Sequence, residues 1–202
     1  MSFLDKLFNL LKNNPDSKKT SEESPYMPDA ALPLDEKFTI NFKKNGGKFL
    51  YCETMEEVYQ HFGHILSENR WEGTKLFSHH PSLEKKFKNF DIEYTTVKDR
   101  HTTACFILCE YLIADTGSIL ISSNQIKEEK PGALPDNFIV FATTSQMVNT
   151  IGEGLKGIQH RYKGKIPSNI TTINHFEIKA ENDFLSYGSS SKNLYLLLLE
   201  DL

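Results

Sequence analysis

Short apolar runs separated by polar turns fill the chain from residue 35 onward, and two spacings alternate among them. Apolar residues three or four positions apart indicate amphipathic helices, whereas continuous apolar runs of about four to eight residues indicate buried strands. This alternation predicts an α/β fold with an open, mainly parallel sheet and helices on both faces. Helical spacing occurs at residues 38–44, 54–66 and 81–87, and strand-like runs at 48–52, 74–78, 92–95, 118–122, 138–142, 170–173 and 194–199.

Start and stop signals locate several of these elements. Gly46 and Gly47 follow two lysines and end the first helix. Thr54 and Glu57 have capping-box spacing and begin the second. The run 104–112 is apolar almost throughout, so helix and strand both stay open there. After the strand 138–142, Thr144 or Ser145 can cap another helix, whose core stripe would be Met147, Ile151, Leu155, Ile158 and Tyr162.

The chain divides into an arm, a linker and one domain. Apolar residues at helical spacing predict an amphipathic helix over residues 1–13, and Pro15 follows it. Residues 14–34 are rich in Lys, Ser, Glu and Pro and predict a flexible linker. The α/β domain then occupies residues 35–202. Docking of the arm on its own domain and docking on a partner both stay open.

Composition narrows the class of protein. The 202 residues are 39% hydrophobic and 25% charged, as in soluble globular proteins. The net charge is −4 and the basic residues are scattered, which argues against nucleic acid or an anionic membrane as the partner. No apolar run reaches the roughly 20 residues of a membrane span, and no secretory signal is visible.

Three cysteines, Cys52, Cys105 and Cys109, lie in apolar runs and predict buried thiols in a reducing cytosol. An iron–sulfur cluster usually takes four thiolates, so we expect none on this chain alone. No glycine-rich nucleotide loop is present, and the pairs His61/His64 and His79/His80 lack acidic or cysteine partners at metal-binding spacing. We therefore expect neither a cofactor nor a metal.

The first candidate site is the turn formed by Asp115, Thr116, Gly117 and Ser118. Its hydroxyls and amides can cradle an anion, and the alternative is a structural turn that satisfies its own backbone. The same letters occur in aspartic proteases, which need a second such carboxylate. This chain has one copy of the motif among helices, so a protease is disfavoured.

Two further candidates contain hydroxyl groups. Thr143, Thr144 and Ser145 follow the strongest strand, where ligands bind in open α/β sheets, and the alternative role is helix capping. Gly188 and Ser189 precede the last strand and form either a ligand-binding turn or a flexible one. No Gly-x-Ser-x-Gly elbow supports a hydrolase serine.

Residues 104–147 resemble the LUD-domain family, the lactate-utilisation protein C group. The family hallmark is an Ile-Ala-(Asp/Glu)-Thr-Gly-(Thr/Ser)-Leu/Ile run, which corresponds to residues 113–120. Leu134-Pro135, the apolar strand 138–142 and a helix opening near Ser145 follow in the family order. Residues 42–47 agree upstream, so the likeness covers about residues 35–202.

The resemblance implies a fold like that of the ribose-phosphate isomerase and CoA-transferase class. It also implies cytosolic work beside iron–sulfur proteins that oxidise L-lactate to pyruvate, with no established catalytic residues to transfer. The chain departs from the family at residues 174–182, where a Gly-Pro-Ser-Arg run is replaced, and at 188–191, where Gly-Ser-Ser-Ser replaces Gly-x-His-Gly-Pro. An Arg is the natural clamp for a carboxylate or phosphate, so its loss favours a divergent binding or assembly role.

Two functional hypotheses follow. The first is an accessory subunit of an L-lactate utilisation system with iron–sulfur partners, without catalysis by this chain alone. The second is an enzyme or sensor for an anionic ligand, such as a 2-hydroxy acid, a sugar phosphate or an acyl-CoA. Its ligand would lie between residues 115–118 and 143–145, which requires the two turns to lie side by side at one rim of a shared parallel sheet.

Overall fold

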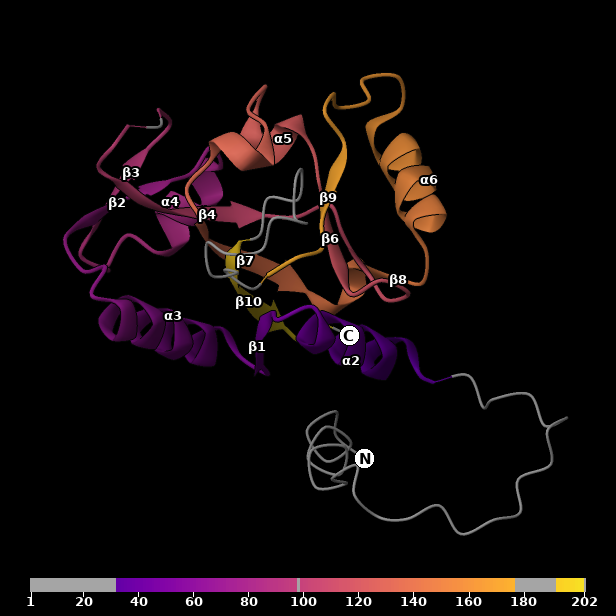
Figure 1. Cartoon of the computed structure of the whole chain (residues 1–202), viewed down its shortest axis with the longest axis horizontal. Coiled ribbons are helices and arrows are strands. Elements are labelled where there is room, and N and C mark those ends of the chain that lie inside the picture. The colour runs from indigo at the N-terminus through magenta and orange to yellow at the C-terminus, as the bar shows by residue number, and fades with distance from the viewer. Residues whose placement is uncertain (1–31, 98, 177–191, 202) are drawn as a thin grey trace, which may run out of the picture.

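The computed structural model describes residues 32–97, 99–176 and 192–201, and its centre is a six-stranded sheet (Figure 1). Every neighbouring pair is parallel, and among the described residues β1 and β3 each pair with a strand on one side only, so the predicted open parallel sheet is confirmed. The undecided run 104–112 is mostly the third-from-edge strand β4. In spatial order the strands are β1 (Lys48–Cys52), β10 (Asn193–Leu199), β7 (Asn137–Thr143), β4 (Thr102–Leu108), β2 (Thr74–Phe77) and β3 (Ile92–Thr95).

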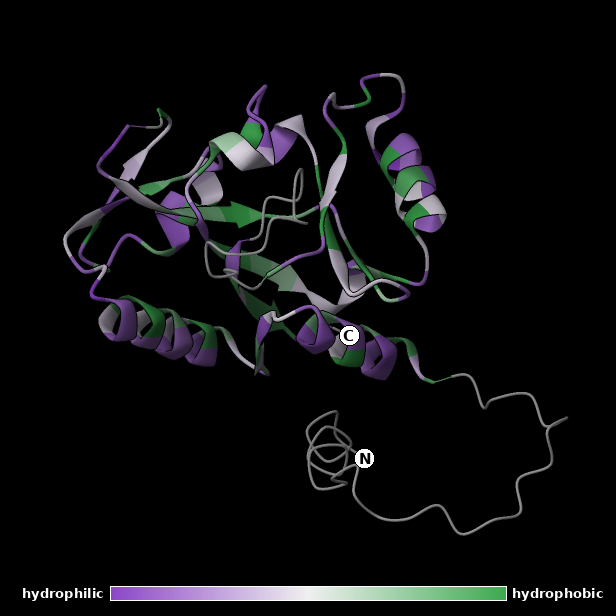
Figure 2. Cartoon of the chain, viewed as in Figure 1, coloured by the Kyte–Doolittle hydropathy of each residue, from purple (hydrophilic) through white to green (hydrophobic). Residues whose placement is uncertain are grey.

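Helices α3 (Met55–Asn69) and α4 (Pro81–Lys86) cover one face of this sheet. Thr54 caps α3 by accepting a hydrogen bond from the Glu57 amide, as the sequence predicts. The apolar stripe of α3 is buried against the strands, and Phe62 packs on Phe106 of β4 with 4.7 Å between ring centroids. Figure 2 shows the apolar residues gathered on the strands, with hydrophilic residues on the outer sides of the helices.

Helices α2 (Leu34–Lys44) and α5 (Ser123–Ile126) lie on the opposite face. Phe38 and Phe42 of α2 are fully buried in a core that also contains Phe138 and Leu196 of the sheet. Helices therefore cover both faces, as expected. A short 3-10 turn, η1 (Pro131–Ala133), precedes β7.

A second, four-stranded sheet also packs on this face, and the sequence did not reveal it. Its order is β8 (Met147–Val148), β5 (Tyr111–Ile113), β6 (Ser118–Ile121) and β9 (Thr171–Ile173). The β5–β6 and β6–β9 pairs are antiparallel. Helix α6 (Ile151–Tyr162) covers its outer side, at the edge of the molecule in Figure 1.

This sheet overturns the expected placement of the two candidate turns. Residues 115–118 form the tight turn between β5 and β6, and a tight turn reverses the chain, so the strands pair antiparallel with each other. Residues 143–145 follow β7 of the large parallel sheet. The two turns therefore do not share one parallel sheet, and that prediction is wrong.

The helix predicted to be capped by Thr144 or Ser145 is capped by Thr150 instead and begins at Ile151. Residues Thr144–Gln146 form the 3-10 turn η2, and Met147 then pairs with Leu112 in β8. Thr150 caps α6 and Glu153 completes the capping box. Met147 is thus a strand residue, and Ile151 and Leu155 are more than one-third exposed instead of core. Ile158 is buried as predicted.

Several expectations fall outside the described residues. These are the arm helix at residues 1–13, residues 14–31 of the linker, and the turn containing Gly188 and Ser189. Across the ranges that are described, none of the helices combines the length and the apolar character needed to cross a membrane.

Candidate functional site

A cavity of about 430 Å³ opens beyond the carboxyl ends of the central strands. Leu108 is the last residue of β4, and Cys109 and Glu110 follow it directly. The remaining wall comes from the segments that follow β2 and β7 and from helices α5 and α6. In full, the lining residues are His80, Leu108, Cys109, Glu110, Asn124, Gln125, Gln146, Arg161 and Tyr162. This edge is where ligands bind in open α/β sheets.

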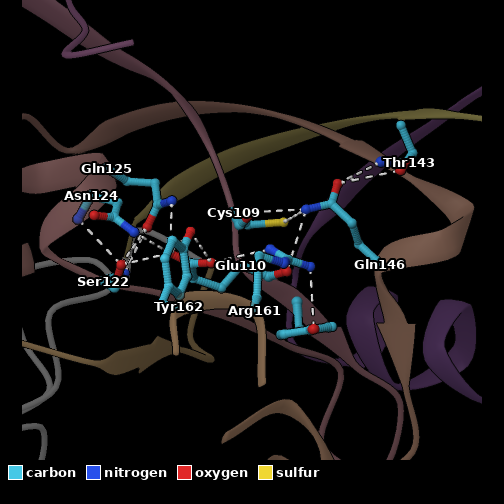
Figure 3. A network of polar contacts seen from close by, with 10 residues as sticks. Cys109, Glu110, Ser122, Asn124, Gln125, Thr143, Gln146, Arg161 and Tyr162 are labelled. Carbon is cyan, nitrogen blue, oxygen red and sulfur yellow. Dashed lines mark hydrogen bonds and ion pairs between the residues drawn. The ribbon is translucent and has the colours of Figure 1, made fainter. Parts of the chain in front are cut away.

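Glu110 is the centre of the polar network in this cavity (Figure 3). Its side chain is 1% exposed, and Oε1 accepts hydrogen bonds from Ser122 Oγ (2.7 Å), Asn124 Nδ2 (3.1 Å) and Gln125 Nε2 (3.2 Å). The Tyr162 hydroxyl donates to Oε2 at 3.1 Å. A buried carboxylate is costly unless donors surround it, and here four neighbouring side chains supply them.

Arg161 pairs with Glu110 from the last turn of α6. Its Nη1 lies 3.3 Å from Glu110 Oε2, and its Nη2 donates to the Tyr111 hydroxyl at 3.2 Å. The guanidinium carbon lies 4.9 Å from the centroid of the Tyr111 ring. The Arg161 side chain is 44% exposed, so one part of it contacts the buried Glu110 carboxylate and another part contacts solvent.

Gln146 joins the end of β7 to the end of β4. Its Oε1 accepts from the Thr143 amide at 2.9 Å, and its Nε2 donates to the Cys109 carbonyl at 2.7 Å. Burial raises the pKa of the Cys109 thiol well above its ordinary value, and Glu110 adds to this effect. Burial and Glu110, in that order, also raise the pKa of Tyr162. Both groups therefore stay protonated at neutral pH, and the Tyr162 hydroxyl donates to Glu110.

His79 and His80 follow β2 at this edge. His80 lines the cavity, and its Nδ1 lies 2.6 Å from Ser82 Oγ. Burial lowers the pKa of His79, and the Lys127 charge lowers it further. Within the three described stretches of chain, no cluster of three or more His, Cys, Asp or Glu side chains is placed to hold a metal ion.

The first predicted site, the β5–β6 turn, is packed against α2. The Asp115 carboxylate pairs with Lys37, whose ammonium also donates to Asn149 Oδ1 at 3.0 Å. Asn41 Nδ2 donates to the Ala114 carbonyl at 2.8 Å.

The rest of this turn is also engaged. Thr116 and Ser118 share a hydrogen bond of 2.6 Å between their hydroxyls, and Asn45 Nδ2 donates to the Thr116 carbonyl at 2.7 Å. Gly117 has φ +60°, and an added Cβ would overlap the backbone of α2. These contacts show that the turn packs the small sheet against α2.

The second predicted site, the η2 turn, already holds an anion from the chain itself. Asp201 Oδ1 accepts from the Ser145 amide (2.8 Å) and the Thr144 hydroxyl (2.9 Å), and Oδ2 accepts from the Ser145 hydroxyl (2.7 Å). Burial acts to raise the pKa of Asp201, but these hydrogen bonds outweigh it and bring the pKa to about 2. Of Thr143, Thr144 and Ser145, Thr143 is the one whose amide donates to Gln146, a residue that lines the cavity.

Comparison with known proteins places the chain in a family. A model described as LUD domain matches residues 79–199, more than half of the chain. The chain belongs to the LUD-domain family. The matched segment includes every residue that lines the cavity, so the site lies within the LUD domain itself.

One solved structure resembles this LUD-domain chain. It is the crystal structure of a DUF162 family protein from Deinococcus radiodurans, with a TM-score of 0.58 and 14% identity. The match covers 85% of this chain and 100% of that one, and at this identity it shows a shared fold. Among curated proteins, none matches this chain.

The cavity of this LUD domain consists mostly of residues that the sequence did not single out. One signal was available, because Glu110 is the only charged residue between Ala104 and Ala114. A lone carboxylate inside a buried run needs donors from elsewhere in the fold. Arg161 and Tyr162 have no comparable signal, because a basic residue in the last turn of a helix is ordinary.

Proposed function

We propose that this LUD-domain protein is a non-catalytic, accessory subunit of a cytosolic system that oxidises L-lactate to pyruvate together with iron–sulfur proteins. The observation that carries the proposal is membership of the LUD family across residues 79–199, the segment that contains the lactate-utilisation motif at residues 113–120.

The contacts in the cavity support an accessory role. A nucleophile needs a general base within hydrogen-bonding distance. The Cys109 thiol is instead held protonated by burial, and its sulfur accepts a hydrogen bond from Gln146 Nε2 at 3.7 Å. The Glu110 carboxylate is surrounded by donors and is not available to remove a proton from a ligand.

The cysteines support partners that supply the redox centres. Cys52 packs in the core beneath α3, whereas Cys105 and Cys109 pack in the core on the other face of the sheet. All three are buried thiols, so they form no common set of ligands for a cluster. Buried thiols outside disulfides also suit the reducing cytosol.

Affinity capture tests this proposal. The tagged full-length chain is recovered from native cells grown on L-lactate and on a second carbon source, with untagged cells as the control. We expect iron–sulfur proteins to be recovered with it, and deletion of its gene to slow growth on L-lactate only. Repeated recovery of the chain alone, together with normal growth on L-lactate, would contradict the proposal.

A second candidate function is binding of a small anionic molecule, as an enzyme or a sensor. The observation that favours it is the cavity itself, which lies at the carboxyl ends of β4 and β7 and has the half-exposed Arg161 in its wall. This placement differs from the one expected between residues 115–118 and 143–145, because those residues bind α2 and Asp201 instead.

A further inference from the structure

We propose that the cavity at the carboxyl ends of β4 and β7 binds the carboxylate of a small monocarboxylic acid, with Arg161 as its clamp. This inference deepens the second candidate function and rests on it. It does not depend on the lactate-system proposal.

The unused hydrogen-bonding capacity in the cavity is mostly donor capacity. A guanidinium has five N–H donors, and Arg161 hydrogen-bonds to Glu110, Tyr111 and the Tyr162 hydroxyl, which leaves two N–H groups over. Asn124 and Gln125 each have an amide with two N–H groups and donate one to Glu110 Oε1. Asn124 also shares a hydrogen bond with the Tyr162 hydroxyl, so the spare N–H groups are those of Arg161 and Gln125. These donors suit an acceptor-rich group.

Arg161 can take a further hydrogen-bonding partner in addition to Glu110 and Tyr111. Its bonds of 3.3 Å and 3.2 Å are long for contacts between charged or strongly polar groups, and its side chain is 44% exposed. Tyr111 holds the guanidinium from one side, with its ring centroid 4.9 Å from the guanidinium carbon and its hydroxyl accepting from Nη2. A fork of parallel N–H donors in a fixed plane matches the two oxygens of a carboxylate.

Charge selects a monoanion over a dianion. Glu110 brings one buried negative charge to the wall, and Arg161 is the lining side chain that balances it. His80 is the other basic lining residue, and its Nδ1 is engaged with Ser82. The buried thiol and phenol of Cys109 and Tyr162 are neutral because burial keeps both protonated. Because Glu110 already balances Arg161, every negative charge on the ligand adds to the net negative charge of the site, so a dianion is disfavoured more than a monoanion.

The walls also suit a short carbon chain beside the carboxylate. Leu108, Cys109 and the Tyr162 ring form apolar surface next to the polar network. A volume of about 430 Å³ lies within the range of small-molecule sites, which are usually lined by apolar groups with a few placed polar ones. The ligand class is therefore a small organic acid with one carboxylate.

Calorimetric titration of the full chain tests the inference with defined probes. L-Lactate, pyruvate and 2-hydroxybutyrate are compared with lactamide, which replaces the carboxylate by a neutral amide, and with glucose 6-phosphate and inorganic phosphate. We expect the acids to bind, and lactamide and both phosphates to bind about tenfold or more weakly, because one charge-assisted contact is worth that factor.

Variants then test the clamp. Arg161→Gln should weaken binding of the best acid about tenfold or more, Arg161→Lys should restore part of it, and the exposed control Arg100→Gln should leave it unchanged. Equal binding of lactate and lactamide, tighter binding of a phosphate, or wild-type affinity in Arg161→Gln would overturn the inference while leaving ligand binding intact. No binding by any probe would overturn the second candidate function as well.

Discussion

At position 117 the chain has room for a hydrogen atom only. Gly117 combines a left-handed backbone, φ +60°, with direct contact against the backbone of Asn41 and Phe42 in α2. The helix backbone cannot rotate away as a side chain would. The glycine of the LUD motif therefore has a packing reason at this position, separate from any ligand.

Gly117→Ala should lower the free energy of unfolding by about 3 kcal/mol or more, because a left-handed alanine costs about 1–2 kcal/mol and the overlap with α2 adds to it. Gly164→Ala is the matched control, since Gly164 also has positive φ but nothing within 4 Å of an added Cβ. It should lose only the backbone cost of about 1–2 kcal/mol. Urea unfolding measures both, and equal losses would show that the contact with α2 is unimportant.

At the scale of elements, α6 shows how a helix start depends on its neighbours. Both η2 and α6 begin with a capping-box pattern, Thr143 with Gln146 and Thr150 with Glu153. The first box leads into β8, because Met147 and Val148 find a strand partner in β5. Only the second box leads into a long helix. Gly154 and Gly157 then let α6 approach Leu120 and Tyr111 closely.

Thr150→Ala should lower the free energy of unfolding by about 1 kcal/mol, because the Glu153 amide loses its acceptor, Thr150 Oγ1. Thr96→Ala, at an exposed position with no hydrogen bond among the described residues, is the control and should be neutral within about 0.5 kcal/mol. Thermal or urea unfolding of both variants decides the matter. A neutral Thr150→Ala would mean that packing of Ile158, and not the cap, determines where α6 begins.

At the scale of the whole molecule, side chains from distant segments join the layers. Glu110 lies between the two sheets and bonds to α5 and α6, while Gln146 joins β7 to the end of β4. Asp201, two residues after β10, binds Thr144 and Ser145 after β7. These contacts place the ends of the central strands, and hence the wall of the cavity, relative to one another.

The Asp201 contact predicts a dependence of stability on pH. Its folded pKa of about 2 lies below the ordinary 3.8, so its contribution is fully present above about pH 4 and is lost as the pH falls through 2. Asp201→Asn should therefore be less stable than wild type at pH 7, by less than about 1 kcal/mol because the carboxylate is exposed. The difference should shrink between pH 4 and 2, as measured by urea unfolding. A difference that stays constant down to pH 2 would contradict this account.

The sequence by itself determined the class of fold, the family and most of the large sheet. Local signals were enough for these, because the short apolar run at Phe138 indicates a buried strand and Thr54 with Glu57 indicates a helix start. The motif at residues 113–120 likewise indicated the LUD family, which the match at residues 79–199 confirms. Each of these inferences needs only residues that are close in the chain.

Only the tertiary structure decided which turns lie next to which helices, and where the cavity is. The β5–β6 turn meets α2 from more than 70 residues away, and Glu110 meets Arg161 across 51 positions. Hydrogen bonds and ion pairs between such segments leave no periodic trace in the sequence, because each partner alone resembles an ordinary polar residue. The small mixed sheet is hidden for the same reason, since Met147, Leu112 and Ile119 become neighbours only after the chain has folded.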